Sequence, residues 1–420
     1  MELKRVVVTG LGAITPLGNS VPEFWEQLIN GVSGAGPITL FDASLFKTRF
    51  ACEVKNFDPS TLMDRKEVRK NDRYTLLAIA AAKEAILNSG LDLDTVDKEQ
   101  VGVIFAAGIG GIQTFEQEVG NYFTHIEAGP KFNPFFIPKM ISNMAAGQIA
   151  IMYGFHGPNY STVAACASST NAIIDAFYNI RLGKAKVMVA GGSEAAITPS
   201  SLGGFNALTA ISTRNDDPQG ASRPFSKSRD GFVMAEGGGC LILEELDHAL
   251  ARGANILCEV VGGGLSADAY HMTASHPEGL GAKLVMKRAL EDAEMNPEEI
   301  DYINVHGTST PVGDISEAKA ILNVFGDHAY KLNISSTKSM TGHLLGAAGA
   351  IEAIATILSV VNDIVPPTIN FHEGDEDENI DYKLNFTFNK AQKRKVNAAL
   401  SNTFGFGGQN ASIIVKKFAK

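Results

Sequence analysis

The feature of this sequence that most constrains its fold is an internal repeat. The order of elements expected in residues 1–255 recurs in residues 256–420. In both halves the shared order is strand, helix, strand, strand, helix, strand, strand. A strand at 5–10 corresponds to one at 256–264, and an apolar-striped helix ending at Gly90 corresponds to one beginning near Gly281. The chain is therefore predicted to consist of two copies of one unit.

The other matched segments extend the repeat to the end of the chain. They pair 101–111 with 300–310, 160–166 and its following helix with 331–340 and its following helix, 186–195 with 383–390, and 237–246 with 410–418. Continuous apolar strands that alternate with helices indicate sheets covered on both faces. We therefore expect an α/β fold with two central helices buried between the sheets of the two halves. In such a duplicate, loops at the carboxyl ends of strands from both halves converge, and we look there for a functional site.

The most apolar run, 344–361, contains a single charged residue, Glu352. Its length nearly suffices to cross a bilayer. Because no other run is like it and its neighbours alternate with strands, it is predicted to be a buried helix of a soluble protein, and no membrane span is expected.

Bulk composition excludes several functions. The net charge is −10 and the sequence pI is about 5.5, which argues against a nucleic-acid-binding protein. The four cysteines are scattered without a C-x-x-C pair, so neither a structural zinc site nor a disulfide framework is indicated. The first twelve residues lack the features of a signal peptide and read as a strand. A reducing, cytoplasmic location is expected.

Cys166 differs from the other cysteines in its position. It lies where a strand-like run ends and a helix is expected to begin at about Ser169. The positive end of a helix lowers a thiol pKa, and its free backbone N–H groups can bind an oxyanion. Small neighbours such as Ala165 and Ala167 would let a substrate carbonyl approach. The alternative is a small buried hydrophobic residue, which is a frequent role of a lone cysteine.

Two histidines of the second half favour the nucleophile interpretation. His306 and His343 each lie in a loop that follows an expected strand and corresponds to a loop near Cys166. Lys338 lies five residues before His343. Either histidine alone could be structural, but together they place two imidazoles beside a thiol. This set predicts a nucleophile accompanied by neutral hydrogen-bond donors.

Six stretches of the chain closely resemble the elongating 3-oxoacyl-[acyl-carrier-protein] synthases, and the synthase II type in particular. They are AACASS around Cys166, STRNDDPQGASRPF (212–225), RDGFVMAEGGG (229–239), VHGTSTPVGD (305–314), STKSMTGHLLGAAG (336–349) and NTFGFGGQN (402–410). The resemblance covers essentially the whole chain. It implies a thiolase-type fold, in which duplicated βαβαβ halves form a layered αβαβα arrangement.

The resemblance also implies a role for each matching residue. Cys166 would accept the acyl group, while His306 and His343 would bind the oxygen of the malonyl thioester. Lys338 and Glu317 would form a charged pair that holds the histidine loop. The remaining expected contacts are Thr308 and Thr310 with the phosphopantetheine arm, and Phe406 as a gate whose N–H completes an oxyanion hole with that of Cys166.

Specificity and docking are indicated less directly. Ile112 and Phe205 would line the acyl pocket, although either could belong to the core. Lys66, Arg69 and Lys70 belong to a basic cluster in an acidic protein, and we expect them to dock an acidic carrier protein, although a solvated helix face would look the same. Two positions depart from the family pattern: Ala164 replaces a common Thr, and Thr209 stands where a basic residue is often found.

The resemblance implies a decarboxylating condensation of an enzyme-bound acyl group with malonyl-acyl carrier protein. Acyl carrier protein would be the partner, the enzyme a homodimer, and no metal or organic cofactor is expected, since phosphopantetheine arrives on the carrier. The Phe- and Pro-rich segment 112–160 would pack on a partner subunit or cap a substrate tunnel. Three alternatives are a ketosynthase of a polyketide or aryl-polyene pathway, a non-catalytic chain-length partner, and a degradative thiolase, although the last would need a second cysteine where this chain has Phe404 and Phe406. Bound monovalent cations and acyl chain length stay open.

Overall fold

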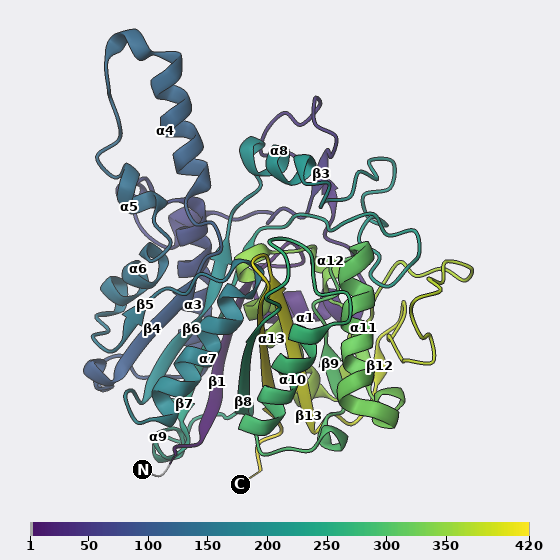
Figure 1. The fold of residues 1–420 in the computed structure, drawn as a ribbon. Helices are drawn as coiled ribbons and strands as arrows, with labels where there is room; N and C mark the ends of the chain where they lie inside the picture. The colour runs from purple at the N-terminus through teal and green to yellow at the C-terminus, as the bar shows by residue number, and fades with distance from the viewer. Residues whose placement is uncertain (1–2, 420) are drawn as a thin grey trace.

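The computed structural model describes residues 3–419 and contains one ten-stranded mixed sheet, in the order β10-β9-β13-β14-β8-β1-β7-β6-β4-β5 (Figure 1). The repeated elements of the first half are β1 (Val6–Ile14), α3 (Arg73–Ser89), β4 (Val101–Ala106), β5 (Asn159–Tyr160), α7 (Ser168–Arg181), β6 (Val187–Glu194) and β7 (Gly237–Glu245). Those of the second half are β8 (Cys258–Ala267), α10 (Leu280–Asp292), β9 (Tyr302–Asn304), β10 (Asn333–Ser335), α13 (Ala348–Asn362), β13 (Ala398–Gly405) and β14 (Gln409–Lys416).

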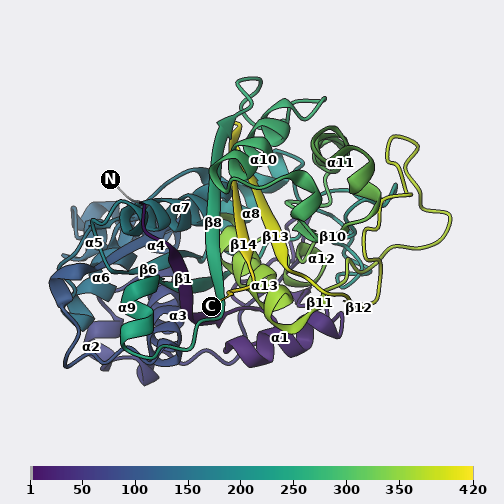
Figure 2. The same ribbon diagram turned by 90° about the horizontal axis from the view of Figure 1, so that it is seen from below.

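The two halves have the same strand order and the same directions. In the first half β7 pairs antiparallel with β1 and β6, and β4 pairs parallel with β6 and β5. In the second half β14 pairs antiparallel with β8 and β13, and β9 pairs parallel with β13 and β10. Antiparallel pairing of β1 with β8, such as Val7 opposite Glu259, joins the half-sheets (Figure 2). The predicted layered α/β fold of two equivalent halves is confirmed. The boundary at 255/256 stays a prediction.

Helices α7 and α13 form the central layer. Each contacts strands of both halves, whereas α3 packs on β1, β6 and β7, and α10 packs on β8 and β14. The two central helices approach closely where Gly349 faces Thr170. The apolar segment Leu345–Asn362 is long and apolar enough to cross a membrane, but 83% of it is buried inside the fold. It is the core helix that its sequence predicts.

One matched pair in the predicted repeat is wrong. Residues 383–390 are not the counterpart of β6, because that place in the sheet is taken by β13. The segment has the alternating pattern of a strand, with Leu384 and Phe386 buried. Its backbone, however, is left-handed at Thr387 and Asn389, with φ of 52° and 61°, and makes only isolated bridges. Alternating burial alone therefore does not identify a sheet strand.

The remaining elements are short or lie outside the repeat. They are α1 (Val21–Ile29), β2 (Gly36–Pro37), β3 (Phe50–Ala51), α2 (Arg65–Val68), α4 (Ile112–Thr124), α5 (Phe136–Met140), α6 (Met144–Tyr153), α8 (Pro199–Ala207), α9 (Leu246–Ala251), α11 (Pro311–Phe325), α12 (Lys338–Thr341), β11 (Ile364–Val365) and β12 (Gln392–Lys393). Short 3₁₀ turns, Ala165–Ala167 and Leu345–Ala347, lead into α7 and α13. Helix α4 projects from the body of the molecule (Figure 1).

Candidate active site

Cys166 lies at the entrance to central helix α7, in a backbone conformation that sequence alone does not reveal. The preceding residue, Ala165, is left-handed with φ of 47°. Ser168 stabilises this turn, because its hydroxyl donates to the Ala165 carbonyl at 2.6 Å and accepts from the Ala164 N–H at 2.8 Å. The strained turn presents the thiol at the end of the helix, and only 8% of Cys166 is exposed.

The second half repeats this turn without a nucleophile. Leu345 has φ of 50°, and Gly346 stands where the first half has Cys166. The N–H of Gly346 donates to the buried carboxylate of Glu194, which also accepts N–H groups from the loop 108–110. A carboxylate therefore occupies the place in the second half where an oxyanion would bind in the first. Of the two equivalent turns, only the one in the first half carries a thiol.

The predicted histidines lie together beside the thiol. Nε2 of His343 is 3.0 Å from Sγ of Cys166, and the rings of His343 and His306 are 5.4 Å apart and nearly perpendicular. The backbone of His343 is fixed by Val233 and Ala235 on the loop before β7. Nδ1 of each ring is buried and has no hydrogen-bond partner within residues 3–419. No hydrogen bond at Nδ1 therefore fixes which nitrogen of a neutral ring carries the proton.

Burial has the largest effect on the pKa values of Cys166, His306 and His343. It raises the pKa of Cys166 to about 12, although the Lys338 charge and the Phe406 N–H oppose this. Burial thus acts on the thiol pKa in the opposite direction to the lowering expected from the helix end. Burial, together with the nearby Lys338 charge, holds the pKa of both histidines well below 6.5. Both imidazoles are neutral at physiological pH.

Glu317, on α11, holds the loop that carries His306. Its carboxylate accepts the N–H groups of His306 at 2.9 Å and Gly307 at 2.8 Å, and the Asn402 amide at 3.2 Å. The expected ion pair between Glu317 and Lys338 is wrong. The Lys338 ammonium instead pairs with Glu352, since α13 passes directly behind the site and brings that carboxylate to it.

A cavity of about 540 Å³ opens above the thiol. Its walls include, of the residues singled out in the sequence, Cys166, Phe205, Thr209, His306, Thr308, Thr310, Glu317, His343, Phe404 and Phe406. The hydroxyls of Thr308 and Thr310 lie 3.1 Å apart. Ile112 is not on these walls but packs with Phe205 in the apolar cluster that includes Cys166. Lys338 lies behind the histidines, almost fully buried.

The basic residues expected to dock a carrier form one surface segment. Lys66 lies on α2 and Arg69 directly follows it, and both are exposed. Lys70 is half-buried, with its ammonium 2.5 Å from Glu67 and 5.7 Å from the Phe135 ring centre. Neither Lys66 nor Arg69 has an ion-pair partner within residues 3–419. Their charges are available to an acidic partner.

Sequence reasoning missed two buried carboxylates. Glu352 reads as a lone charge in an apolar helix, and Glu194 as the polar end of a strand. A lone acid in an otherwise fully apolar helix does carry a signal, because such a group requires a partner. Nothing local in the sequence identifies that partner as Lys338. Among residues 3–419 no three His, Cys, Asp or Glu side chains are arranged to hold a metal ion.

A thiol and two neutral imidazoles beside one apolar cavity, with the Phe406 N–H directed at the thiol sulfur, define a thiolase-type condensing enzyme. Residues 3–249 match the beta-ketoacyl synthase N-terminal domain, and residues 257–372 match the beta-ketoacyl synthase C-terminal domain. The chain belongs to the beta-ketoacyl synthase family.

Named relatives cover the full chain. It is 50% identical to 3-oxoacyl-[acyl-carrier-protein] synthase 2 of Synechocystis sp., over 100% of this chain and 99% of the relative. It is 48% identical to the enzyme of the same name from Coxiella burnetii, over 99% of each chain. A solved ketosynthase, in complex with its type II polyketide synthase acyl-carrier protein, is 34% identical with a TM-score of 0.90, over 99% of this chain and 100% of the other.

Proposed function

We propose that this enzyme condenses an acyl group, held as a thioester on Cys166, with malonyl-acyl carrier protein to give 3-oxoacyl-acyl carrier protein and CO₂ in fatty acid elongation. The observation that supports this most directly is the 3.0 Å approach of a neutral His343 to the thiol, with His306 at its side. The names of the full-length relatives point the same way.

In the first step the Cys166 sulfur attacks the carbonyl carbon of the incoming thioester. Because the thiol pKa is about 12, its proton must leave as the S–C bond forms, and Nε2 of His343 is positioned to receive it. The N–H groups of Cys166 and Phe406 face the developing oxyanion. The carrier thiol departs with the proton, and the acyl group stays on Cys166.

In the second step malonyl-carrier protein enters and loses CO₂. The electrons of the broken C–C bond form an enolate, whose oxygen accepts an N–H from His306 and one from His343. Removing one such donor from a buried site costs about 3 kcal/mol of transition-state stabilisation. The enolate carbon attacks the acyl-Cys166 carbonyl, the S–C bond breaks with its electron pair on sulfur, and the Cys166 thiolate takes up one proton from solvent. Neutral imidazoles suit both steps, because Nε2 can present either a lone pair or an N–H.

The carrier interaction is part of this proposal. Thr308 and Thr310 would contact the phosphopantetheine arm on the cavity wall, and Lys66, Arg69 and Lys70 would meet the acidic surface of the carrier. Thr209 supplies no charge at the cavity mouth. The solved relative bound to its acyl-carrier protein supports a carrier partner for this fold. Phosphopantetheine is the only prosthetic group in this proposal, and it belongs to the carrier.

We also propose that two copies associate through the segment that projects from the body. Between Ile112 and Tyr160 it exposes large apolar side chains, among them Phe115, Phe123, Ile126, Phe132, Phe135, Ile137, Ile151 and Met152. A concentration of exposed large apolar side chains in one segment is typical of an interface. Light scattering should give a dimer for the wild type and a monomer for Ile137→Lys with Phe123→Lys. A wild-type monomer would contradict the homodimer. The four buried free cysteines support a cytoplasmic location.

Intact-protein mass spectrometry tests the function. The wild type should gain one acyl group from acyl-carrier proteins and lose it when malonyl-carrier protein is added, giving a 3-oxoacyl product. Cys166→Ala should gain none, while Cys258→Ala, which removes a buried thiol far from the cavity, should load normally. If no acyl group loads, the chain is better explained as a non-catalytic chain-length partner. Loading and condensation only with polyketide or polyene intermediates would favour the related pathways.

A further inference from the structure

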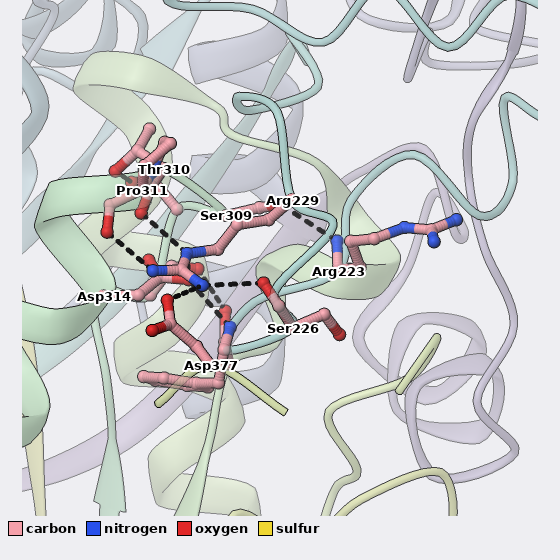
Figure 3. Close-up of polar contacts among 12 residues, drawn as sticks. Arg223, Ser226, Arg229, Ser309, Thr310, Pro311, Asp314 and Asp377 are labelled. Atoms are coloured by element: carbon pink, nitrogen blue, oxygen red, sulfur yellow. Dashed lines mark hydrogen bonds and ion pairs between the residues drawn. The ribbon is translucent and has the colours of Figure 1, made fainter. Parts of the chain in front are cut away.

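Arg229 lies behind the loop that carries His306, Thr308 and Thr310, and its guanidinium is nearly inaccessible to solvent (Figure 3). Nε donates to the Thr310 carbonyl at 3.0 Å, and Nη2 to the Pro311 carbonyl at 2.6 Å. Nη1 donates to the Ser226 carbonyl at 2.7 Å and contacts Asp377 at 2.9 Å. One side chain thus joins three separate stretches of chain.

The backbone just before the two carbonyls that Arg229 binds is strained. Ser309 lies between the two threonines and is left-handed, with φ of 64°. The N–H groups of Gly231 and Arg223 bind its carbonyl and hydroxyl, both at 3.0 Å. A non-glycine residue keeps such a conformation only where its surroundings impose it. The segment 223–231 therefore sets the direction of the neighbouring threonine side chains.

A general role in stabilising the fold does not explain why a positively charged residue stands at position 229. A cation beside the first residues of α11 opposes the helix dipole, which favours negative charge there. The site compensates with two carboxylates, Asp377 at 2.9 Å and Asp314 at 3.5 Å, and Asp314 also accepts the Phe225 N–H at 2.8 Å. Five donors on three coplanar nitrogens can reach several widely spaced acceptors at once, whereas an apolar side chain has no donor and a lysine has three donors on a single nitrogen.

We propose that Arg229 is a positioning residue for pantetheine-borne substrates: it fixes the loop 308–311 so that Thr308 and Thr310 face the cavity in register with Cys166. The inference rests on the proposed function, because it assumes that this cavity wall receives the carrier's arm. Arg229 does not itself line the cavity and takes no part in bond making. Its loss should therefore affect the use of carrier-borne thioesters more than the reactivity of the thiol.

The test compares two reactions of Cys166 in Arg229→Met and Arg229→Lys. The second-order rate of acylation by acyl-carrier protein should fall about 10- to 100-fold, the scale expected for a misplacement near 1 Å. Alkylation of Cys166 by iodoacetamide, which has no pantetheine arm, should stay within about threefold of wild type. Arg252→Met is the matched control, because Arg252 binds two carbonyls and one carboxylate at the end of α3, away from the cavity.

If Arg229→Met does not fold, Asp377→Asn removes the negative charge that pairs with the guanidinium at its more exposed side and should lower acylation by a smaller factor, again without changing alkylation. Acylation within twofold of wild type in a folded Arg229→Met protein would overturn the inference. So would a parallel fall in acylation and alkylation, which would indicate general damage to the site. A wild-type enzyme that fails to load would instead overturn the proposed function.

Discussion

The ammonium of Lys338 is paired with the carboxylate of Glu352, and both side chains are almost completely buried behind the two histidines. The pair joins the start of α12 to the middle of central helix α13. Burial raises the pKa of Glu352 to about 7, and the lysine opposes this. The positive charge of Lys338 in turn helps to keep the pKa of His306 and His343 low. Burial and a charge that touches no substrate thus together keep the site histidines neutral.

Removing either Lys338 or Glu352 alone should lower the free energy of unfolding more than removing both. Lys338→Met leaves a buried carboxylate without its counter-charge, and Glu352→Met leaves a buried ammonium, so each should lose about 3 kcal/mol of unfolding free energy. The double variant Lys338→Met with Glu352→Met should be more stable than either single variant. Urea unfolding of the four proteins measures the coupling. Additive losses would mean that the two groups do not interact.

Both site histidines should stay neutral across the physiological range. Because burial and the Lys338 charge lower their pKa values well below 6.5, lowering the pH from 8 to 6 should not protonate them. Nitrogen NMR of histidine-labelled enzyme, with His306→Asn and His343→Asn used to assign the signals, should show two imidazoles that do not titrate in this window. In Lys338→Met both transition midpoints should move upward. A wild-type midpoint near 6.5 for either ring would contradict the electrostatic argument.

The sequence predicts the duplicated architecture well because the repeat is carried by continuous apolar strands and by two helices with striped or wholly apolar faces. The prediction of a strand at 383–390 is wrong. Leu384 and Phe386 alternate with polar residues as in a strand, but left-handed residues in the segment prevent a regular strand from forming. An alternation of buried and exposed residues shows which side chains face the core. It does not show which strand, if any, the backbone pairs with by hydrogen bonds.

At the site, position relative to strands and helices is sufficient to bring Cys166, His306 and His343 together. The partner of Lys338 could not be predicted, because it depends on which turn of α13 passes behind the histidines. The direction of the thiol pKa could not be predicted either, since its largest cause is burial, which depends on tertiary packing. Local pattern identifies chemical groups, whereas tertiary packing determines their ionisation.

Substituting Gly349 should separate the two central helices. A Cβ at this position would lie 2.0 Å from the Thr170 hydroxyl oxygen and 2.9 Å from its backbone nitrogen. Gly349→Ala should therefore lower the unfolding free energy by about 1 to 3 kcal/mol, the usual cost of overpacking. Gly204→Ala is the control, because an added Cβ there meets nothing within 4 Å on helix α8. Equal melting temperatures for Gly349→Ala and the wild type would show that α7 and α13 can move apart freely.

The contribution of Glu317 to the stability of the fold should fall as the pH rises. Burial raises its pKa from 4.5 to about 7, so between these values the folded protein holds a proton that the unfolded chain releases. A group that is protonated more in the folded state contributes stability at low pH, and that stability is lost as the pH rises through about 7.

Glu317→Gln isolates this contribution from those of the other buried carboxyls. The difference in unfolding free energy between wild type and Glu317→Gln should be more favourable to wild type at pH 5.5 than at pH 8.5, by about 2 kcal/mol. Glu298→Gln, at an exposed carboxyl, should leave the slope unchanged. If the Glu317→Gln and wild-type curves run parallel, the carboxyl is already ionised at pH 5.5. The N–H groups of His306 and Gly307 would then outweigh burial, and the histidine loop would be held by a full negative charge throughout the working range.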